Sequence, residues 1–219
     1  MTFEVRPFCE EDLAAAAALL ADRHRRHRAA EPLLPAAYEE QDAAGAEIEA
    51  LWRGDGVTGA VAIRDGRLVG YMLGAPRADG VWGQNGWVEL AGHAAAEPED
   101  VRDLYAAISQ CWVDGGRTRH FALVPATDTA LLDAWFRLSF GQQQAYGIRA
   151  VDPVAGWPAG VRHAEPRDVD ALVASAPLVT EHQKRAPTFA FRPRPDDPDE
   201  LRADIEQDIA SPDIGCLVF

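Results

Sequence analysis

The sequence predicts an α/β fold in which a mixed central β-sheet is flanked by helices, present as one complete copy followed by the first half of a second. Three observations support this prediction. Strand-like and helix-like patterns alternate along residues 3–149 in the order β-α-α-β-β-β-α-β-α-β. The dipeptide Asp65-Gly66, a strong hairpin signal, joins two of the strand-like runs. The opening pattern of the chain also recurs after residue 160.

The first half of this unit begins with a short strand in which Phe3 and Val5 alternate with polar residues. The helix after it has acids at its start and basic residues at its end, which is the distribution that the helix macrodipole favours. The elements expected here are a strand at 3–5, a helix from 10–12 to 23–28, a helix at 42–52, and strands at 57–64 and 68–76.

The second half of the unit contains a helix whose ends are marked by Pro98 and by Gly115-Gly116. The elements expected here are a strand at 87–93, a helix at 99–114, a strand at 119–125, a helix at 129–138 and a final strand at 144–149. Residues 151–160 are rich in proline and glycine and are predicted to be a linker. The predicted domains are therefore residues 1–150 and 161–219.

An internal repeat supports this division. Val5-Arg6-Pro7 reappears as Val161-Arg162-His163, at an offset of 161 − 5 = 156 residues. The helix after each start carries apolar residues at i, i+3, i+4 and i+7, which places one stripe against a core. These residues are Leu13, Ala16, Ala17 and Leu20 in the first copy and Val169, Leu172, Val173 and Ala176 in the second. The near-constant offset predicts a duplication.

The repeat also bears on the end of the chain. Phe219 corresponds to Ile63, which lies within a predicted strand of the first copy. A second copy as long as the first would extend the chain to roughly 310 residues. We therefore expect this chain to be a piece of a tandem protein, or one whose second copy is completed by something else.

Composition excludes several classes of function. The 219 residues are 47% hydrophobic, which is ordinary for a globular protein, and the net charge is −14. That charge argues against binding to nucleic acid or to an anionic membrane surface. The sequence has no apolar run long enough to span a membrane and no signal-peptide layout. Its three widely spaced cysteines do not indicate a disulfide framework or a metal site. We expect a cytoplasmic protein.

Taken together, these sequence features resemble those of the GNAT superfamily of acyl-CoA-dependent N-acyltransferases. The element order matches, as do the opening Val5-Arg6-Pro7 and the hairpin Arg64-Asp65-Gly66-Arg67. The end of the helix at 129–138 is similar to the family's closing motif. The residues that stand near the positions of that motif are Asp128, Ala130, Trp135, Ser139 and Phe140. The resemblance covers roughly residues 3–150 as one copy and 161–219 as the start of another.

The resemblance implies that acetyl-CoA is the co-substrate and that an amine, on a small molecule or a peptide, is the acceptor. In the family, backbone N–H groups at a helix N-terminus receive the pyrophosphate through the motif Arg/Gln-x-x-Gly-x-Gly/Ala. By position, the cofactor-binding candidates in this sequence are Leu90, Ala91, Gly92, Val101 and Arg102.

The stretch 91–103 departs from that motif. The second glycine is absent, and Pro98 lacks an N–H donor. Carboxylates also crowd the helix start, where each would oppose a phosphate. They are Glu97, Glu99, Asp100 and Asp103. We therefore expect that the first copy has lost its cofactor loop.

The catalytic candidate is Glu89, because the resemblance places a general base on this strand and burial beside Trp87 and Leu90 would raise the pKa of its carboxyl group. The alternative is that Glu89 faces solvent or forms an ion pair. His93 could assist proton transfer or could lie on the surface. Trp135 stands where family members often carry a tyrosine acid, and an indole N–H cannot replace it.

The run Arg23-His24-Arg25-Arg26-His27-Arg28 is strongly basic. It could bind an acidic substrate near the cleft, or it could be a helix C-terminus that pairs with acidic neighbours. Two functions remain open. One is a tandem acetyltransferase whose active site lies in the second copy. The other is a non-catalytic GNAT-like module that binds a ligand or supports a homodimer.

Overall fold

The computed structural model describes every residue except 1, 80–81, 152–155, 157 and 186–196. The chain divides into two units, which are described separately. The first unit consists of Met1–Asp79 and Gly83–Arg149, and the main part of the second unit is Ala150–Phe219.

The first unit begins with a strand, two helices and a β-hairpin. Its elements up to residue 79 are β1 (Phe3–Pro7), η1 (Glu10–Asp12), α1 (Leu13–Ala30), η2 (Ala36–Glu39), α2 (Gln41–Trp52), β2 (Thr58–Arg64) and β3 (Arg67–Asp79). The remaining elements are β4 (Gly83–Val88), η3 (Leu90–Gly92), β5 (His93–Ala95), α3 (Asp100–Asp114), β6 (His120–Ala122) and α4 (Thr129–Arg137).

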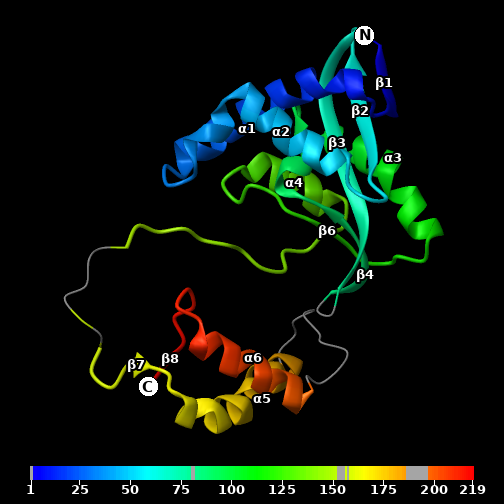
Figure 1. Ribbon diagram of the computed structural model, residues 1–219. Helices are drawn as coiled ribbons and strands as arrows, with labels where there is room; N and C mark the ends of the chain where they lie inside the picture. The colour runs from blue at the N-terminus through cyan, green and yellow to red at the C-terminus, as the bar shows by residue number, and fades with distance from the viewer. Residues whose placement is uncertain (1, 80–81, 152–155, 157, 186–196) are drawn as a thin grey trace. The chain divides into compact units, whose positions relative to one another are not determined.

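The strands of this unit form one mixed sheet in the order β1-β2-β3-β4-β6, with β5 paired to β3 (Figure 1). The pairs are antiparallel except β4 and β6, which are parallel. The predicted hairpin between β2 and β3 is confirmed, with Arg64 opposite Arg67. Asp65 and Gly66 have φ angles of 49° and 79°, the left-handed pair that a type I′ turn requires.

The sheet separates two apolar cores, because successive side chains on a strand point to opposite faces. On β2, Val61 packs with α1 and α2, whereas Ala60 and Ala62 pack with α3 and α4. On β3, Tyr71 likewise packs in the core with α1 and α2, and Met72 packs in the core with α3 and α4. The unit is therefore a three-layer arrangement, as predicted.

Trp112 of α3 is one of two buried tryptophans in the core on the α3 side, and it is 1% exposed. Its indole lies directly on two glycines of adjacent strands. A Cβ on Gly74 would lie 2.5 Å from Cη2 of Trp112, and a Cβ on Gly86 would overlap the indole as well. The absence of two side chains thus creates the space that the indole fills.

Two predicted strands differ from the structure. The strand expected at 87–93 is interrupted by η3, so that it becomes β4 and β5 on different stretches of β3. Gly92 lies at this break, where a Cβ would stand 2.7 Å from the carbonyl oxygen of Leu73. The strand expected at 144–149 is not formed. Its alternation of side chains is suited to a strand, but it pairs with no other strand in the described part of the chain.

The second unit contains β7 (Arg162–His163), η4 (Pro166–Asp168), α5 (Val169–Arg185), α6 (Pro198–Ala210) and β8 (Leu217–Val218). Strands β7 and β8 pair antiparallel, with Arg162 opposite Val218. Val169 is the only hydrophobic residue of this unit that is fully buried among the described residues. Part of the predicted linker, residues 152–155 and 157, lies outside the described residues.

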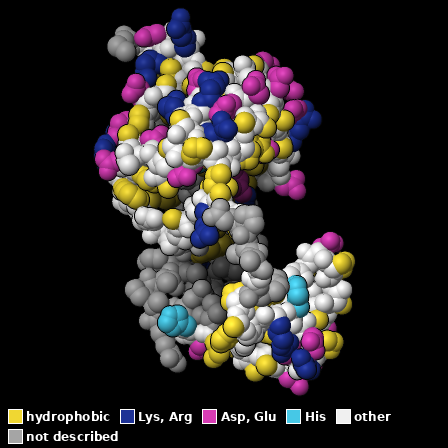
Figure 2. Space-filling model, turned by 90° about the vertical axis from the view of Figure 1, so that its left-hand side faces the viewer, with side chains coloured by type: hydrophobic (Ala, Val, Ile, Leu, Met, Phe, Trp, Pro, Cys, Tyr) yellow, Lys and Arg dark blue, Asp and Glu magenta, His cyan; other side chains and the backbone are white. Residues whose placement is uncertain are grey.

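The charges of the molecule are distributed over its surface. On the face drawn in Figure 2, acidic and basic side chains of the first unit lie interspersed. In the described parts of the chain, no helix combines the length and the apolar character that crossing a membrane requires.

Candidate functional site

The start of α3 is the place where the resemblance locates a pyrophosphate. Its first N–H groups are already used within the chain: those of Asp100, Val101 and Arg102 donate to the carbonyl oxygens of residues 97, 98 and 99 at 3.1, 3.3 and 3.2 Å. The carboxylate of Asp100 is buried and accepts from Arg64 at 2.5 Å. Burial raises the pKa of Asp100, and the charge of Arg64 opposes that change. Anionic side chains therefore occupy the positive end of the helix.

The cofactor candidates at the break between β4 and β5 lie close together, because η3 brings them into one turn. Gly92 is buried, and its N–H donates to the carbonyl oxygen of Glu89 at 2.8 Å. Leu90 is 36% exposed. Val101 is a fully buried core residue of α3, and Arg102 next to it is exposed and pairs with Asp103.

The carbonyl oxygens of this break are bound by buried side chains from other elements. Arg23 of α1 donates to the carbonyl oxygen of Leu90 at 2.6 Å and to that of His93. Tyr71 of β3 donates through its hydroxyl group to the carbonyl oxygen of Ala91 at 2.7 Å. The break is thus held by donors that the chain itself supplies.

Arg23 is 5% exposed, and no described carboxylate forms an ion pair with it. Its Nε has no hydrogen-bond partner among the described residues. Burial lowers the pKa of its guanidinium group. Two main-chain carbonyl dipoles therefore provide the direct partners of a buried cation, which makes Arg23 an unusual structural residue.

His93 joins β5 to the segment after β6. Its Nε2 lies 2.9 Å from the carbonyl oxygen of Leu123, beyond the point where the β4–β6 pairing ends at Val88 and Ala122. Its ring meets that of Trp135 edge to face, with centroids 5.6 Å apart. Because both side chains are buried, protein side chains fill the space between β5 and the segment after β6.

This environment gives a prediction for the pH dependence of stability. Burial, together with the charge of Arg23, lowers the pKa of His93 to about 3. The unfolded chain therefore takes up the proton first, so that stability is complete above pH 6.5 and decreases as the pH falls below it. At pH 5 we expect the loss due to His93 to be about 2 kcal/mol in the free energy of unfolding.

The measurement is urea unfolding of the wild type and of His93→Gln between pH 7.5 and 5. Glutamine can still donate to Leu123 but cannot be protonated, so the variant should lose less stability on acidification. His182→Gln serves as the control, because that histidine is exposed. His27 and His120 also have lowered pKa values and contribute equally to both proteins. Parallel profiles for wild type and His93→Gln would contradict the prediction.

Glu89, the catalytic candidate, forms an ion pair with Arg77, which also lies over the Trp87 ring with its Cζ 5.1 Å from the centroid. The ion pair that was the alternative for Glu89 is therefore present. Trp135 is 2% exposed, and its Nε1 has no partner among the described residues. The structure thus brings Glu89, Leu90, Ala91 and Gly92 together and leaves Arg102 on the surface of α3.

The basic run at the end of α1 stabilises the loop that follows it. His24 contacts the carbonyl oxygen of Pro35 at 2.8 Å. Arg28 donates to the carbonyl oxygen of Leu34 at 3.0 Å and pairs with Glu39 at 2.9 Å. These contacts agree with the interpretation of the run as a helix C-terminus with acidic neighbours.

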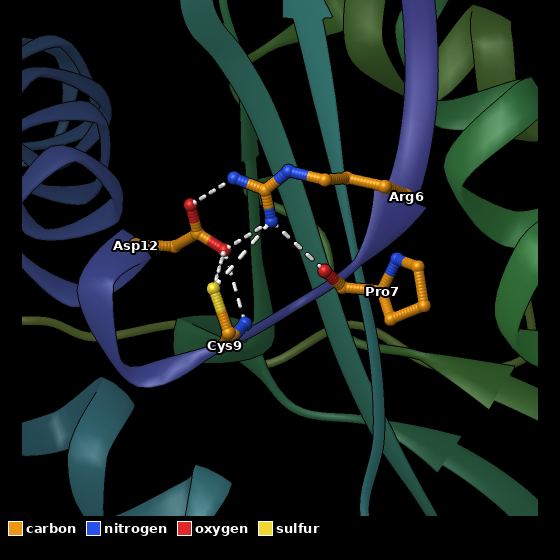
Figure 3. Close-up of polar contacts among 4 residues, drawn as sticks. All are labelled: Arg6, Pro7, Cys9 and Asp12. Carbon is orange, nitrogen blue, oxygen red and sulfur yellow. Dashed lines mark hydrogen bonds and ion pairs between the residues drawn. The ribbon is translucent and has the colours of Figure 1, made fainter.

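A second polar cluster fixes the start of α1 (Figure 3). Arg6 donates two hydrogen bonds of 2.7 Å to the carboxylate of Asp12, which also accepts from the N–H of Cys9 at 3.0 Å. Burial opposes ionisation of Asp12, but these hydrogen bonds prevail and lower the pKa of its carboxyl group. Arg6 and Asp12 thus join β1 to the beginning of the helix.

The second unit contains the same arrangement. Arg162 donates to Asp168 at 2.7 and 2.8 Å, and the N–H of Glu165 donates to Asp168 at 2.8 Å. The hydrogen bond from Arg162 lowers the pKa of Asp168 strongly. In both units a strand, a 3-10 turn and a helix therefore follow one another around an Arg–Asp ion pair six residues apart.

Sequence reasoning missed the structural roles of Arg23 and Tyr71. A signal for Arg23 was present, since it follows Ala16 and Leu20 at helical spacing and so continues the buried stripe of α1. No comparable signal marked Tyr71, because any apolar residue suits its strand position. The described residues contain no group of three or more histidine, cysteine, aspartate or glutamate side chains placed to hold a metal ion.

Solved structures resemble this chain over almost their whole length. A mutant of the BH1408 protein from Bacillus halodurans gives a TM-score of 0.53 at 14% identity, over 68% of this chain and 99% of that one. The ribosomal-protein-alanine N-acetyltransferase from Brucella melitensis biovar Abortus 2308 gives 0.49 at 15% identity, over 68% and 100%. The aminoglycoside N-acetyltransferase AAC(6')-Iy, in complex with CoA, gives 0.48 at 17% identity, over 68% and 95%.

The chain therefore shares the fold of the BH1408 protein. At this identity the similarity is one of fold, and a fold alone does not specify an acceptor. No protein-family model matches the sequence, and no curated protein matches it.

Proposed function

We propose that this chain belongs to a tandem GNAT N-acetyltransferase that transfers an acetyl group from acetyl-CoA to the amine of a small molecule or peptide. In this proposal residues 1–150 are a structural copy, residues 151–160 a linker, and residues 161–219 the opening of the copy that holds the active site. The repeated Arg–Asp ion pair is the observation that carries the proposal, because both copies also share strand pairing next to it. The N–H of Phe8 donates to Gly59 at 3.0 Å, and that of Ala164 donates to Cys216 at 2.9 Å.

The residues of the first unit do not fit acetyl-CoA. A pyrophosphate at the start of α3 would meet the carboxylates of Glu99 and Asp100, and the N–H groups there already have acceptors. The buried side chains of His93 and Trp135 also occupy the space beside the end of the β4–β6 pairing, where we expect the rest of the cofactor to lie in an active copy. Leu90, Ala91, Gly92, Val101 and Arg102 are accordingly proposed as structural residues in this unit, with Glu89 held in its ion pair.

The test is a calorimetric titration of acetyl-CoA into the 219-residue chain at moderate salt. We expect no saturable heat up to millimolar ligand. A Glu99→Gln/Asp103→Asn variant, measured alongside, should also show no saturable heat, because the packing of His93 against Trp135 does not depend on these charges. Saturable micromolar binding to the wild type would contradict the assignment of the first unit as a structural copy. Glu89→Gln and Arg102→Ala would then be the first variants to measure.

The second candidate function is a non-catalytic GNAT-like module that binds a ligand or forms a homodimer. The buried packing of His93 against Trp135 supports this candidate as well as it supports the first one. Acetyl transfer to a panel of amines, assayed on a protein that carries the complete second copy, separates the candidates, because a module without an active site produces no acetylated product with any of them.

A further inference from the structure

The second unit contains an apolar groove between the start of α5 and the end of α6. The groove has a volume of about 310 Å³, and its apolar lining includes Ala164, Val169 and Ile209. Val169 is buried and Ile209 is half-buried, so the groove reaches into the unit rather than lying flat on it. Its volume is at the lower end of the range for small-molecule pockets, which is room for one ring system.

The internal repeat identifies the residues of the first unit that correspond to this lining. Phe8 corresponds to Ala164, because each follows the first strand of its unit and donates its N–H to the second strand. The acceptor is the carbonyl oxygen of Gly59 in the first unit and that of Cys216 in the second. An aromatic side chain of the first unit is therefore replaced by a methyl group in the second.

The second helix of each unit follows the same correspondence. Trp52 of α2 and Ile209 of α6 are related by the offset that relates Gly59 to Cys216, since 209 − 52 = 157 and 216 − 59 = 157. In the first unit the rings of Trp52 and Phe8 are in contact, with centroids 5.0 Å apart, and Phe8 is 4% exposed. In the second unit none of the described residues that line the groove is aromatic. The groove thus lies where the first unit has an aromatic pair.

The groove also carries charge of one sign. Glu165 and Glu206 line it, and no lysine or arginine among the described residues does. Glu165 pairs with Arg167 at 3.1 Å. Glu206 lies 4.0 Å from Arg202, which is held more closely by Asp170 at 2.5 Å. The carboxylate of Glu206 is therefore available to a cation that enters the groove.

We propose that this groove binds a small molecule in which an aromatic ring carries a positively charged amine. The ring occupies the space that aromatic side chains fill in the first unit, and the amine pairs with Glu206. Burial of the ring provides most of the affinity, and the carboxylates select against a negatively charged analogue. The site does not rest on the proposed acetyl transfer, because it needs no acetyl-CoA.

The test is a calorimetric titration of tryptamine into the 219-residue chain without acetyl-CoA. We expect saturable binding at one site. Ile209→Trp places in the groove the ring that the first unit has at this position, and it should weaken tryptamine binding at least about tenfold. Leu178→Trp adds the same ring on α5 at a position that is 65% exposed and outside the groove, and it should leave the affinity unchanged.

The charge is tested by a second matched pair of variants. Glu206→Gln should weaken tryptamine binding by about two- to fivefold, the range of an exposed ion pair. Glu200→Gln removes the same charge from an exposed position of α6 outside the groove and should have no effect. Indole-3-propionate, which keeps the ring and reverses the charge, should bind at least about tenfold more weakly than tryptamine.

The opposite results overturn the proposal. Absence of saturable heat up to millimolar tryptamine shows that the groove takes no such ligand. Equal affinity of Ile209→Trp and the wild type shows that the probe binds elsewhere, and equal affinity for the two probes shows that the carboxylates do not select. Amide chemical shifts of the wild type locate tryptamine without any variant. They should change at Val169 and Ala210, and changes confined to the first unit would contradict the site.

Discussion

Replacing Trp112 with alanine is expected to lower the free energy of unfolding of the first unit by about 3–5 kcal/mol, the usual cost of removing a buried tryptophan. The indole is 1% exposed and fills the space above Gly74 and Gly86, where neither strand has a side chain that could move into the cavity. Urea unfolding followed by circular dichroism measures the change. Val113→Ala, at the next position of α3 and 53% exposed, should change stability by less than about 0.5 kcal/mol.

The packing of Trp112 on Gly86 can also be tested by substituting the glycine. Gly86→Ala pushes a methyl group into the indole, and such overpacking costs about 1–3 kcal/mol. In the Trp112→Ala background the methyl group has room, so the cost of Gly86→Ala should decrease or change sign. Simple additivity of the two substitutions would show that the glycine and the tryptophan do not depend on each other.

Replacing Arg23 with methionine should have the next largest effect, a destabilisation of about 2–4 kcal/mol. Methionine has similar length and avoids burying a charge, but it leaves the carbonyl oxygens of Leu90 and His93 without donors. Leaving these two buried carbonyl oxygens without donors destabilises the fold by more than is gained when the charge of Arg23 is no longer buried. The measurement is again the unfolding transition of the first unit.

Arg26→Met is the matched control, because Arg26 lies on the same helix, is exposed and makes no ion pair within the described residues. Arg23→Lys should fall between wild type and Arg23→Met, since one ammonium group cannot span two carbonyl oxygens as a planar guanidinium does. Equal stability of Arg23→Met and Arg26→Met would contradict the role assigned to Arg23.

The order of elements in the first unit was predictable because its signals are local. Alternation, helical spacing and the Asp65-Gly66 turn each act within a few residues, and they identified β1, α1, α2, the hairpin, α3 and α4. The break at η3 was not predictable, because it depends on donors that Arg23 and Tyr71 bring from distant parts of the chain. The strand at 144–149 was predicted wrongly for the same reason, since its side-chain pattern is suited to a strand and pairing is a property of its neighbours.

The candidate site could also be predicted only in part. The crowding of acids at the start of α3 was visible in the sequence, and the structure shows Glu99 and Asp100 in ion pairs there. That His93 would be buried was not visible, because a histidine after a strand is more often exposed. Its position follows from the packing of Trp135, which lies 42 residues further along the chain.

The two Arg–Asp ion pairs have a consequence for the order in which the chain acquires its structure. Each joins residues only six positions apart, so it closes a very short loop and loses little chain entropy. Contacts of this kind can form before distant strands meet. Because each unit has its own pair, we expect the chain to start folding at two independent points, one near residue 6 and one near residue 162.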